Sequence, residues 1–334
     1  MIDEGSPVPC RLCGAQKYIP IYYLDDIETV RCQNCGLVQL SRCLASREEL
    51  TRYYSSKGKD AAPLRSMFDK QKIWRGSKFR LHYFKKYTGL TSGKVLEVGS
   101  SEGHFLALLQ AQGFEVLGVE PSSIGADKHR EKGIPVIESL LEDADLPDSF
   151  FDAICLFQVF EHFEEPKQIA HTFYQKLKVG GRLAIEIPDI FSIGAKFEKN
   201  PHKLFNKEHI CFFSPETLRA LLTDVGFKPI FAHHCDYDGF RLPFGKSLKK
   251  IFVPLFRPAF KGPLDKILLQ EADNYYKTIE TPPDCRTTGS SSLATNRLSK
   301  DLKKALSAPF DIFFGYLAYR LDRGASLYWI GQKI

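Results

Sequence analysis

Short apolar segments alternate with helical segments through the middle of the chain, and this alternation restricts the fold more than any other feature. Residues 94–99 (KVLEVG) and 115–121 (EVLGVEP) are strand-like, and residues 103–113 between them are helix-like. The alternation continues to an expected helix at 166–181 and an expected strand at 182–189. Strands that alternate with helices of about ten residues indicate crossover units and a parallel sheet. In such a sheet the ligand binds at the carboxyl ends of the strands, so functional side chains should follow each strand.

The turn after the first strand is built like a nucleotide-binding turn. Gly99 and Gly103 bracket the entry into the helix, and Glu97 places a carboxylate inside an otherwise apolar strand. Glu120 ends the second strand, and an acidic residue about twenty positions after the first glycine is suited to accept hydrogen bonds from ribose hydroxyls. The turn therefore indicates a ligand that contains a ribose.

Two side chains in this turn argue against a dinucleotide. A pyrophosphate needs a glycine where Ser101 stands, because the backbone must come close to the phosphates. Glu102 beside it would repel a phosphate. The turn suits a ligand with a ribose, no phosphate, and a positive end for Glu97 to face. S-adenosylmethionine, which carries an adenosine, a cationic sulfonium and an α-amino group, fits that description.

Four cysteines near the N-terminus form two pairs, Cys10 with Cys13 and Cys32 with Cys35, and each pair is followed by a glycine. Two CxxC pairs about twenty residues apart are typical of a tetrahedral four-cysteine zinc site. All four ligands are thiolates, so the site is predicted to be structural. Strand-like residues between the pairs indicate a zinc ribbon over residues 1–44. Its few basic side chains are offset by acidic ones, so the electrostatic case for nucleic acid is weak.

Four segments resemble the successive motifs of class I S-adenosylmethionine-dependent methyltransferases. They are residues 95–106 (VLEVGSSEGHFL), 116–122 (VLGVEPS), 150–166 (FFDAICLFQVFEHFEEP) and 177–188 (LKVGGRLAIEIP). The ribbon together with this domain resembles bacterial methyltransferases that have an N-terminal zinc-binding segment, several of which act on sugars or other small metabolites. The resemblance implies a Rossmann-like α/β sheet that is mostly parallel, with an antiparallel last strand.

The resemblance also implies roles for individual positions. Glu97, Gly99 and Gly103, with Ser101 where the family often has glycine, would shape the methionine pocket, and Glu120 would hold the ribose. Later positions would border the rest of the cofactor, with Glu142 or Asp143 near the adenine amino group and Gln158 and Phe160 beside the substrate.

Two histidines are predicted to be catalytic, His162 and His209. Methyl transfer from a sulfonium is an in-line displacement, so positioning is the main task. A neutral hydroxyl or a carbon acid also needs a base, and histidine is the natural choice at neutral pH. His162 follows the fourth strand in an EH pair that recurs in the family, and its alternative role is to bond backbone near the cofactor. His209 follows the fifth strand, on the expected substrate side.

The remaining segments complete the expected domain organisation. Residues 45–92 are predicted to be a helical linker or cap before the methyltransferase core at 93–235, and residues 323–334 to be the final core strand. Residues 236–322 would then be a helical insertion. Within it, residues 246–261 mix basic and apolar side chains and could contact an anionic membrane or a lipid-linked substrate. A cap over the active site is preferred, because two prolines break any long helix there.

Composition excludes few classes of protein. The net charge of +6 permits an anionic partner without requiring nucleic acid. No apolar run reaches the roughly eighteen residues of a transmembrane helix, and the acidic start lacks the apolar region of a secretory signal. The odd count of nine cysteines favours a reducing compartment, so we expect a cytoplasmic protein.

The favoured function is an S-adenosylmethionine-dependent methyltransferase that acts on oxygen or carbon of a small polar metabolite, in particular a sugar, nucleotide sugar or glycan. Two alternatives stay open. One is an RNA methyltransferase that grips RNA through the ribbon, and the other is a protein that binds the cofactor without turnover.

Overall fold

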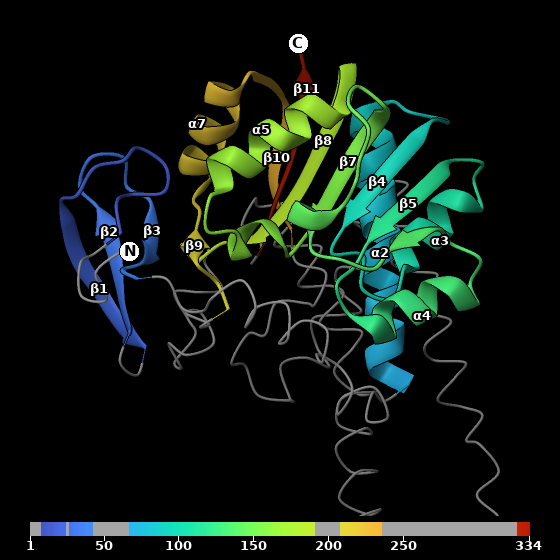
Figure 1. The fold of residues 1–334 in the computed structure, drawn as a ribbon, viewed down its shortest axis with the longest axis horizontal. Coiled ribbons are helices and arrows are strands. Elements are labelled where there is room, and N and C mark those ends of the chain that lie inside the picture. The colour runs from blue at the N-terminus through green and yellow to red at the C-terminus, as the bar shows by residue number, and fades with distance from the viewer. Residues whose placement is uncertain (1–7, 25–26, 43–66, 191–207, 236–325) are drawn as a thin grey trace, which may run out of the picture.

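The computed structural model describes residues 8–24, 27–42, 67–190, 208–235 and 326–334, which form two sheets (Figure 1). Residues 45–66 of the expected linker, the whole expected insertion at 236–322 and residues 323–325 of the expected final strand lie outside the described residues. In spatial order the larger sheet contains β10 (Phe227–Cys235), β11 (Ser326–Lys333), β8 (Leu177–Pro188), β7 (Phe151–Phe157), β4 (Lys94–Val98), β5 (Glu115–Val119) and β6 (Val136–Ile137).

The predicted fold class is confirmed. β6, β5, β4, β7 and β8 pair in parallel, while β11 is inserted antiparallel between β8 and β10. The sheet is therefore mostly parallel with an antiparallel last strand, as the sequence indicated. Parallel strands need a crossover connection, and the helices between successive strands supply it.

Helices cover both faces of this sheet. They are α2 (Met67–Thr88), α3 (His104–Gln110), α4 (Ser123–Glu131), α5 (Pro166–Lys176) and α7 (Pro215–Val225), with the 3-10 turns η2 (Leu141–Asp143) and η3 (Phe160–His162). The expected helix at 166–181 ends earlier, at Lys176, because Leu177 pairs with Phe151 and opens β8.

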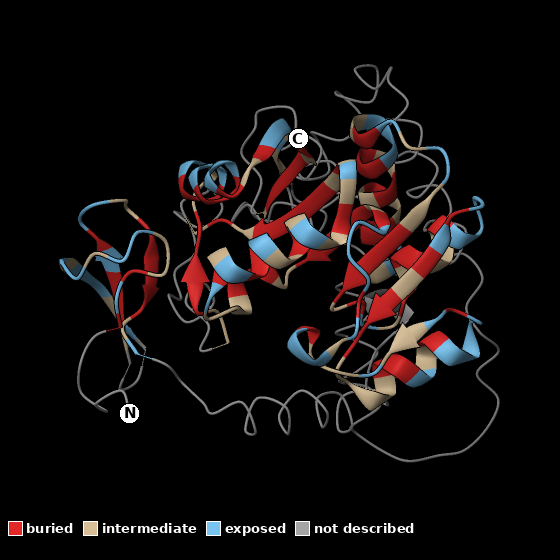
Figure 2. Ribbon diagram, turned by 45° about the horizontal axis from the view of Figure 1, so that its top comes forward, coloured by how far each residue is buried: buried red, intermediate tan, exposed pale blue. Residues whose placement is uncertain are grey.

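The two faces of the sheet bury separate apolar clusters. Along β7, Ile154 and Leu156 belong to one cluster, and Ala153 and Cys155 belong to the other. This alternation follows from the two-residue period of a strand. α5 and α7 complete the first cluster, whereas α2 and α3 complete the second. The central strands are consequently buried along most of their length, while the helices keep an exposed outer side (Figure 2).

The smaller sheet joins the N-terminal ribbon to the domain of the larger sheet. It consists of β1 (Tyr18–Leu24), β2 (Ile27–Cys32), β3 (Val38–Leu40) and β9 (Cys211–Phe212). β9 pairs antiparallel with β3, and Leu40 N–H donates to the carbonyl of Ile210 at 3.0 Å. Leu37, fully buried, packs in the same cluster as α5 and α7. The ribbon is thus anchored to the domain of the larger sheet in two ways. β3 pairs with β9, and Leu37 is buried in the apolar cluster that α5 and α7 complete.

Among the described residues, none of the helices combines the length and the apolar character that crossing a bilayer requires.

Candidate functional site

The turn after β4 has a conformation that its glycines make possible. Gly99 and Gly103 both have positive φ, +67° and +71°. A Cβ on Gly99 would lie 2.5 Å from Val159 Cγ2, and one on Gly103 would lie 2.9 Å from His129 Nε2. Any larger residue would therefore strain the backbone and collide with a packed neighbour. The turn is held tightly against the loop that follows β7.

Ser101 also occupies the left-handed region, with φ +52°. Its side chain is exposed, and its backbone N–H donates to Glu120 Oε2 at 2.7 Å. The residue therefore contributes to the turn through its backbone, in a conformation that glycine adopts more readily.

Changing Ser101 to glycine is expected to raise the free energy of unfolding by about 0.5 kcal/mol, because the relief of the positive φ exceeds the added freedom of the unfolded chain. Cofactor affinity should change by less than about threefold, since glycine keeps the same backbone donor. Denaturant titration and calorimetry measure the two quantities. Ser149→Gly is the matched control, because Ser149 is exposed with φ +50° in a different loop. A gain in affinity of roughly tenfold or more would show that the Ser101 side chain narrows the methionine pocket.

Glu120 links two of the loops at the carboxyl edge of the sheet. Its Oε2 accepts the Ser101 N–H at 2.7 Å, and its Oε1 accepts the Ser122 N–H at 2.9 Å. The residue is 7% exposed. Hydrogen bonds from N–H groups to a carboxylate are among the stronger ones in proteins. Glu120 therefore fixes the turn after β4 against the end of β5, a structural task that the sequence did not reveal.

Glu97 is a buried carboxylate without a hydrogen-bond donor for one of its oxygens. It is 5% exposed, and its Oε2 has no partner among the described residues. Burial raises the pKa of Glu97 to about 8; the nearby Arg80 opposes this rise and Glu120 adds to it. A buried carboxylate of this kind is costly unless a positive group meets it. The residue thus fits a cationic ligand, which agrees with the expectation for S-adenosylmethionine.

A second polar group at this edge was missed by sequence reasoning. Arg80 on α2 donates to both oxygens of Glu186 on β8, at 2.8 and 3.0 Å, and its guanidinium lies 4.7 Å from the centroid of the Phe157 ring. Gln158 Nε2 donates to Glu186 Oε1 at 3.1 Å, and Gln158 has φ +61°. The sequence did contain a signal for this group. Glu186 is a carboxylate inside the otherwise apolar strand expected at 182–189, just as Glu97 is inside the strand at 94–98.

The other predicted cofactor residues lie apart from these contacts. Glu142 and Asp143 are both exposed on η2. Phe160 is fully buried on η3, where its ring packs against Phe163 and Phe213.

The two predicted catalytic histidines meet at one carboxylate, that of Glu161. His162 Nε2 and His209 Nε2 each lie 3.9 Å from Glu161 Oε1, and the two imidazole rings are 5.0 Å apart. His162 Nδ1 is 2.6 Å from the carbonyl oxygen of Glu208. Both histidines are about one-fifth exposed, whereas Glu161 is 2% exposed and burial raises its pKa to about 8. The structure therefore brings together His162 and His209, which are 47 positions apart in sequence.

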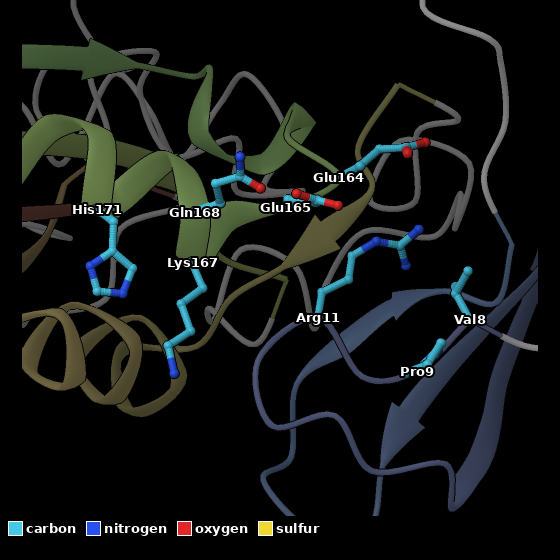
Figure 3. Close-up of a pocket in the computed structure, with 8 residues that line it drawn as sticks. All are labelled: Val8, Pro9, Arg11, Glu164, Glu165, Lys167, Gln168 and His171. Atoms are coloured by element: carbon cyan, nitrogen blue, oxygen red, sulfur yellow. The ribbon is translucent and has the colours of Figure 1, made fainter. Parts of the chain in front are cut away.

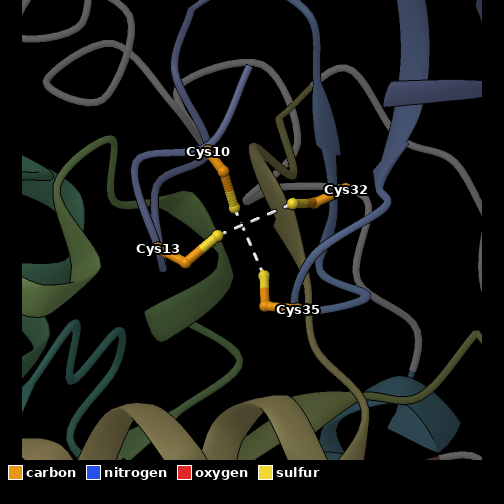
Figure 4. A group of neighbouring side chains, drawn as sticks. All are labelled: Cys10, Cys13, Cys32 and Cys35. Atoms are coloured by element: carbon orange, nitrogen blue, oxygen red, sulfur yellow. Dashed lines mark hydrogen bonds between the residues drawn. The ribbon is translucent and has the colours of Figure 1, made fainter. Parts of the chain in front are cut away.

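The four cysteines of the ribbon point toward one centre from two turns (Figure 4). The Sγ atoms of Cys10 and Cys35 are 3.4 Å apart, and those of Cys13 and Cys32 are 3.6 Å apart. A tetrahedral site with Zn–S bonds of about 2.3 Å spaces its sulfurs by roughly 3.8 Å. The arrangement fits a four-thiolate metal site, with no protein ligand missing.

A cavity of about 590 Å³ lies between the ribbon and α5 (Figure 3). Arg11 enters it from the ribbon, and Glu164, Glu165 and Lys167 border it on the other side. None of its lining residues belongs to the loops at Gly99 and Glu120 or to the histidine cluster. The cavity is a feature of the junction between the two sheets, separate from the candidate active site.

Comparison with known proteins agrees with this geometry. Residues 71–230 match the model of a methyltransferase-domain family. A ubiquinone biosynthesis O-methyltransferase of Xylella fastidiosa is 34% identical over 179 residues, which cover 48% of this chain and 70% of that enzyme. An uncharacterized protein of Methanocaldococcus jannaschii is 31% identical over 145 residues, covering 43% of this chain and 68% of that protein.

A solved structure gives the same fold. Phosphoethanolamine N-methyltransferase 2 of Haemonchus contortus, in complex with S-adenosyl-L-methionine, aligns with a TM-score of 0.50 at 13% identity, covering 89% of this chain and 62% of that one. At this identity the likeness is one of fold alone.

Proposed function

The chain belongs to the class I S-adenosylmethionine-dependent methyltransferases, and on that premise we propose that it methylates an oxygen of a small polar metabolite of the sugar, nucleotide-sugar or glycan class. The observation that carries the proposal is the cluster of His162, His209 and Glu161. In this cluster, groups that can accept a proton meet beside η3, the turn that follows β7. Oxygen is preferred over carbon because the similar Xylella enzyme is named as an O-methyltransferase.

The residues after β4 and β5 would hold the cofactor, which supplies an electrophilic methyl group on a cationic sulfur. Glu97 would face the positive methionine end, and the turn at Gly99 and Gly103 would let the backbone approach it. Glu120 would also accept a hydrogen bond from the ribose, since each carboxylate oxygen can accept more than one hydrogen bond. Residues Glu142, Asp143, Gln158 and Phe160 remain candidates for the adenine and acceptor sides.

Cofactor binding should strengthen as pH rises toward 8. The pKa of Glu97 is raised to about 8 in the free protein by burial, with Arg80 lowering it, Glu120 raising it, and the Cys155 thiol also nearby. A cation favours the ionised carboxylate, so binding releases a proton below this pKa. Affinity should rise roughly tenfold between about pH 6.5 and about pH 8.

Calorimetry across that range measures the effect, and Glu97→Gln is the control. The substitution removes the titrating group, so the steep part of the pH profile should disappear while the protonation of other groups is unchanged. A variant profile as steep as that of the wild type would assign the pH dependence to a different group.

His209 or His162 would take the proton of the acceptor hydroxyl as the methyl group is transferred. A hydroxyl is a poor nucleophile until a base near neutral pKa removes its proton. Both rings are partly exposed, so a substrate can reach them. Their approach to Glu161 would stabilise the imidazolium that forms.

The decisive experiment is a transfer assay with S-adenosylmethionine labelled on its methyl group and pools of sugars, nucleotide sugars, hydroxylated metabolites and RNA. We expect label in a small hydroxylated product, and its loss in His209→Ala. Label in RNA would support the alternative role for the ribbon. Tight cofactor binding without any product would favour the non-catalytic alternative.

We also propose that the four cysteines hold a structural Zn²⁺ ion, because their sulfur spacing suits it. Four reduced thiolates of this kind are typical of the cytoplasm. Contact of residues 246–261 with a membrane or lipid-linked acceptor also remains a proposal, and liposome co-sedimentation tests it.

A further inference from the structure

We propose that Glu161, His162 and His209 bind a divalent metal ion, preferably Zn²⁺, which would hold the hydroxyl of the acceptor. This inference rests on the proposed methyl transfer to oxygen and adds a second metal centre beside the cysteine site. The ligand set of two histidines and one glutamate is one that catalytic zinc sites use, with the remaining position open to water or substrate.

The first support is the spacing of the ligand atoms. One nitrogen or oxygen from each residue lies within 4.8 Å of the other two, and both histidine Nε2 atoms are 3.9 Å from Glu161 Oε1. A separation of 3.9 Å is too long for a hydrogen bond. Ligands bound to one ion by bonds of about 2.1 Å lie roughly 3.0–3.6 Å apart. The two histidine–glutamate separations therefore need to shorten by less than about an ångström to match a coordination site.

The second support is the tautomer of His162. A carbonyl oxygen accepts hydrogen bonds and cannot donate them, so the 2.6 Å contact with Glu208 O requires a proton on Nδ1. In the neutral ring, Nε2 then carries the lone pair, and Nε2 is the atom that faces Glu161. Metal-binding histidines are commonly oriented in this way, with the second ring nitrogen bonded to a backbone carbonyl.

The third support is Glu161 itself. The residue is 2% exposed, and neither carboxylate oxygen accepts a hydrogen bond from another residue in the part of the chain that the structure describes. Leaving both oxygens of a buried carboxylate unsatisfied is costly, and a cation is the partner that offsets the cost most directly. The partly exposed histidines leave the opposite side of the cluster open to an acceptor.

The backbone holds these ligands in place before any ion binds. Ile210 N–H donates to the carbonyl of Glu161 at 2.9 Å, which fixes the chain next to His209 against η3. Val159 lies on the other side of η3 and contacts the turn at Gly99. The cluster is therefore close to the loop that would hold the methionine end of the cofactor, where an acceptor must be placed.

The ion would act on the acceptor in a simple balanced step. It would lower the pKa of the bound hydroxyl, whose proton passes to water. The freed oxygen electron pair then forms the bond to the methyl carbon, and the carbon–sulfur bond breaks with its electron pair remaining on sulfur. The products are a methyl ether and neutral S-adenosylhomocysteine.

Metal content tests the proposal without reference to activity. The full chain is stripped with a chelator, loaded with Zn²⁺, desalted and analysed by mass spectrometry for metal. We expect about two equivalents of zinc for the wild type, one at the cysteines and one at the cluster. His209→Ala and Glu161→Gln should each retain about one equivalent, and His171→Ala, on the exposed side of α5, should retain about two. Loading with Co²⁺ should give a thiolate absorption band in all variants.

The number of zinc equivalents bound by the wild type tests the proposed site even if a variant fails to fold. One equivalent in the wild type after loading with Zn²⁺, Mn²⁺ or Co²⁺ overturns the proposal, as does retention of two equivalents by folded His209→Ala. If the wild type binds one equivalent of metal and still transfers the methyl group, the proposed function stands, with a histidine as the base. A two-metal protein that methylates no hydroxylated acceptor would retain the metal site and refute the acceptor class.

Discussion

Replacing Cys32 with serine is expected to lower methyl transfer roughly hundredfold, while S-adenosylmethionine still binds within about threefold of its wild-type affinity. Cys32 is 1% exposed at the end of β2 and is one of the four clustered thiols. A structural metal site contributes folding free energy, so losing one ligand should unfold the ribbon. β3 would then release β9, and His209 lies two residues before the start of β9.

The measurements are zinc content, the transfer rate and calorimetric titration of the cofactor. The loss should fall on the acceptor side, because β9 pairs with β3 of the ribbon, whereas the turn at Gly99, proposed to hold the cofactor, lies against Val159 in the loop after β7. Gln33→Ala is the matched control, since Gln33 is the exposed neighbour of Cys32 in the same turn. Full activity in zinc-free Cys32→Ser would show that the ribbon does not position His209.

Replacing Glu120 with alanine is expected to weaken S-adenosylmethionine binding by at least about tenfold and up to about a hundredfold. The substitution removes the acceptor for Ser101 N–H and Ser122 N–H as well as the group proposed to hold the ribose. Each hydrogen bond to a charged group contributes about 1.5–3 kcal/mol, so the loss of one to the ribose already accounts for the lower limit.

Titration of S-adenosylhomocysteine alongside S-adenosylmethionine distinguishes loss of the ribose contact from loss of an electrostatic interaction with the sulfonium. Both ligands carry the ribose, so both should lose affinity equally. Glu120→Gln keeps one acceptor oxygen and should lose less than the alanine variant. Glu115→Ala, an exposed position at the start of the same strand, should bind normally. An unchanged affinity in Glu120→Ala would remove Glu120 from the cofactor site.

The larger sheet could be predicted because its strands carry their signal locally. Apart from Lys94, Glu97 and Asp152, residues 94–98 and 151–157 are apolar, as expected for strands buried on both faces, and each segment is followed by a helix. The antiparallel placement of β11 came from the resemblance to the family. The end of α5 was misplaced because Gly180 and Gly181 are typical of a helix end, while strand pairing of Leu177 with Phe151 determines the structure.

The parts of the site that escaped prediction depend on contacts between distant segments. Arg80 and Glu186 are 106 residues apart, and nothing near either residue identifies the other. Glu161 was passed over in favour of His162, since burial distinguishes this carboxylate from a solvated one and burial is not visible in a single sequence. β9 is two residues long, which is too short to have a recognisable pattern. Only its pairing with β3 makes it a strand.

That pairing also orders the events of biosynthesis. β3 is complete about 170 residues before β9 is made. The ribbon therefore leaves the ribosome while the edge of β3 that later pairs with β9 is still unpaired. Its cysteines lie within the first 35 residues and can close around a metal ion at once. The finished ribbon then offers a ready-made template onto which the short strand beside His209 adds when it emerges. The N-terminal module would thus act as a template for the segment that carries His209.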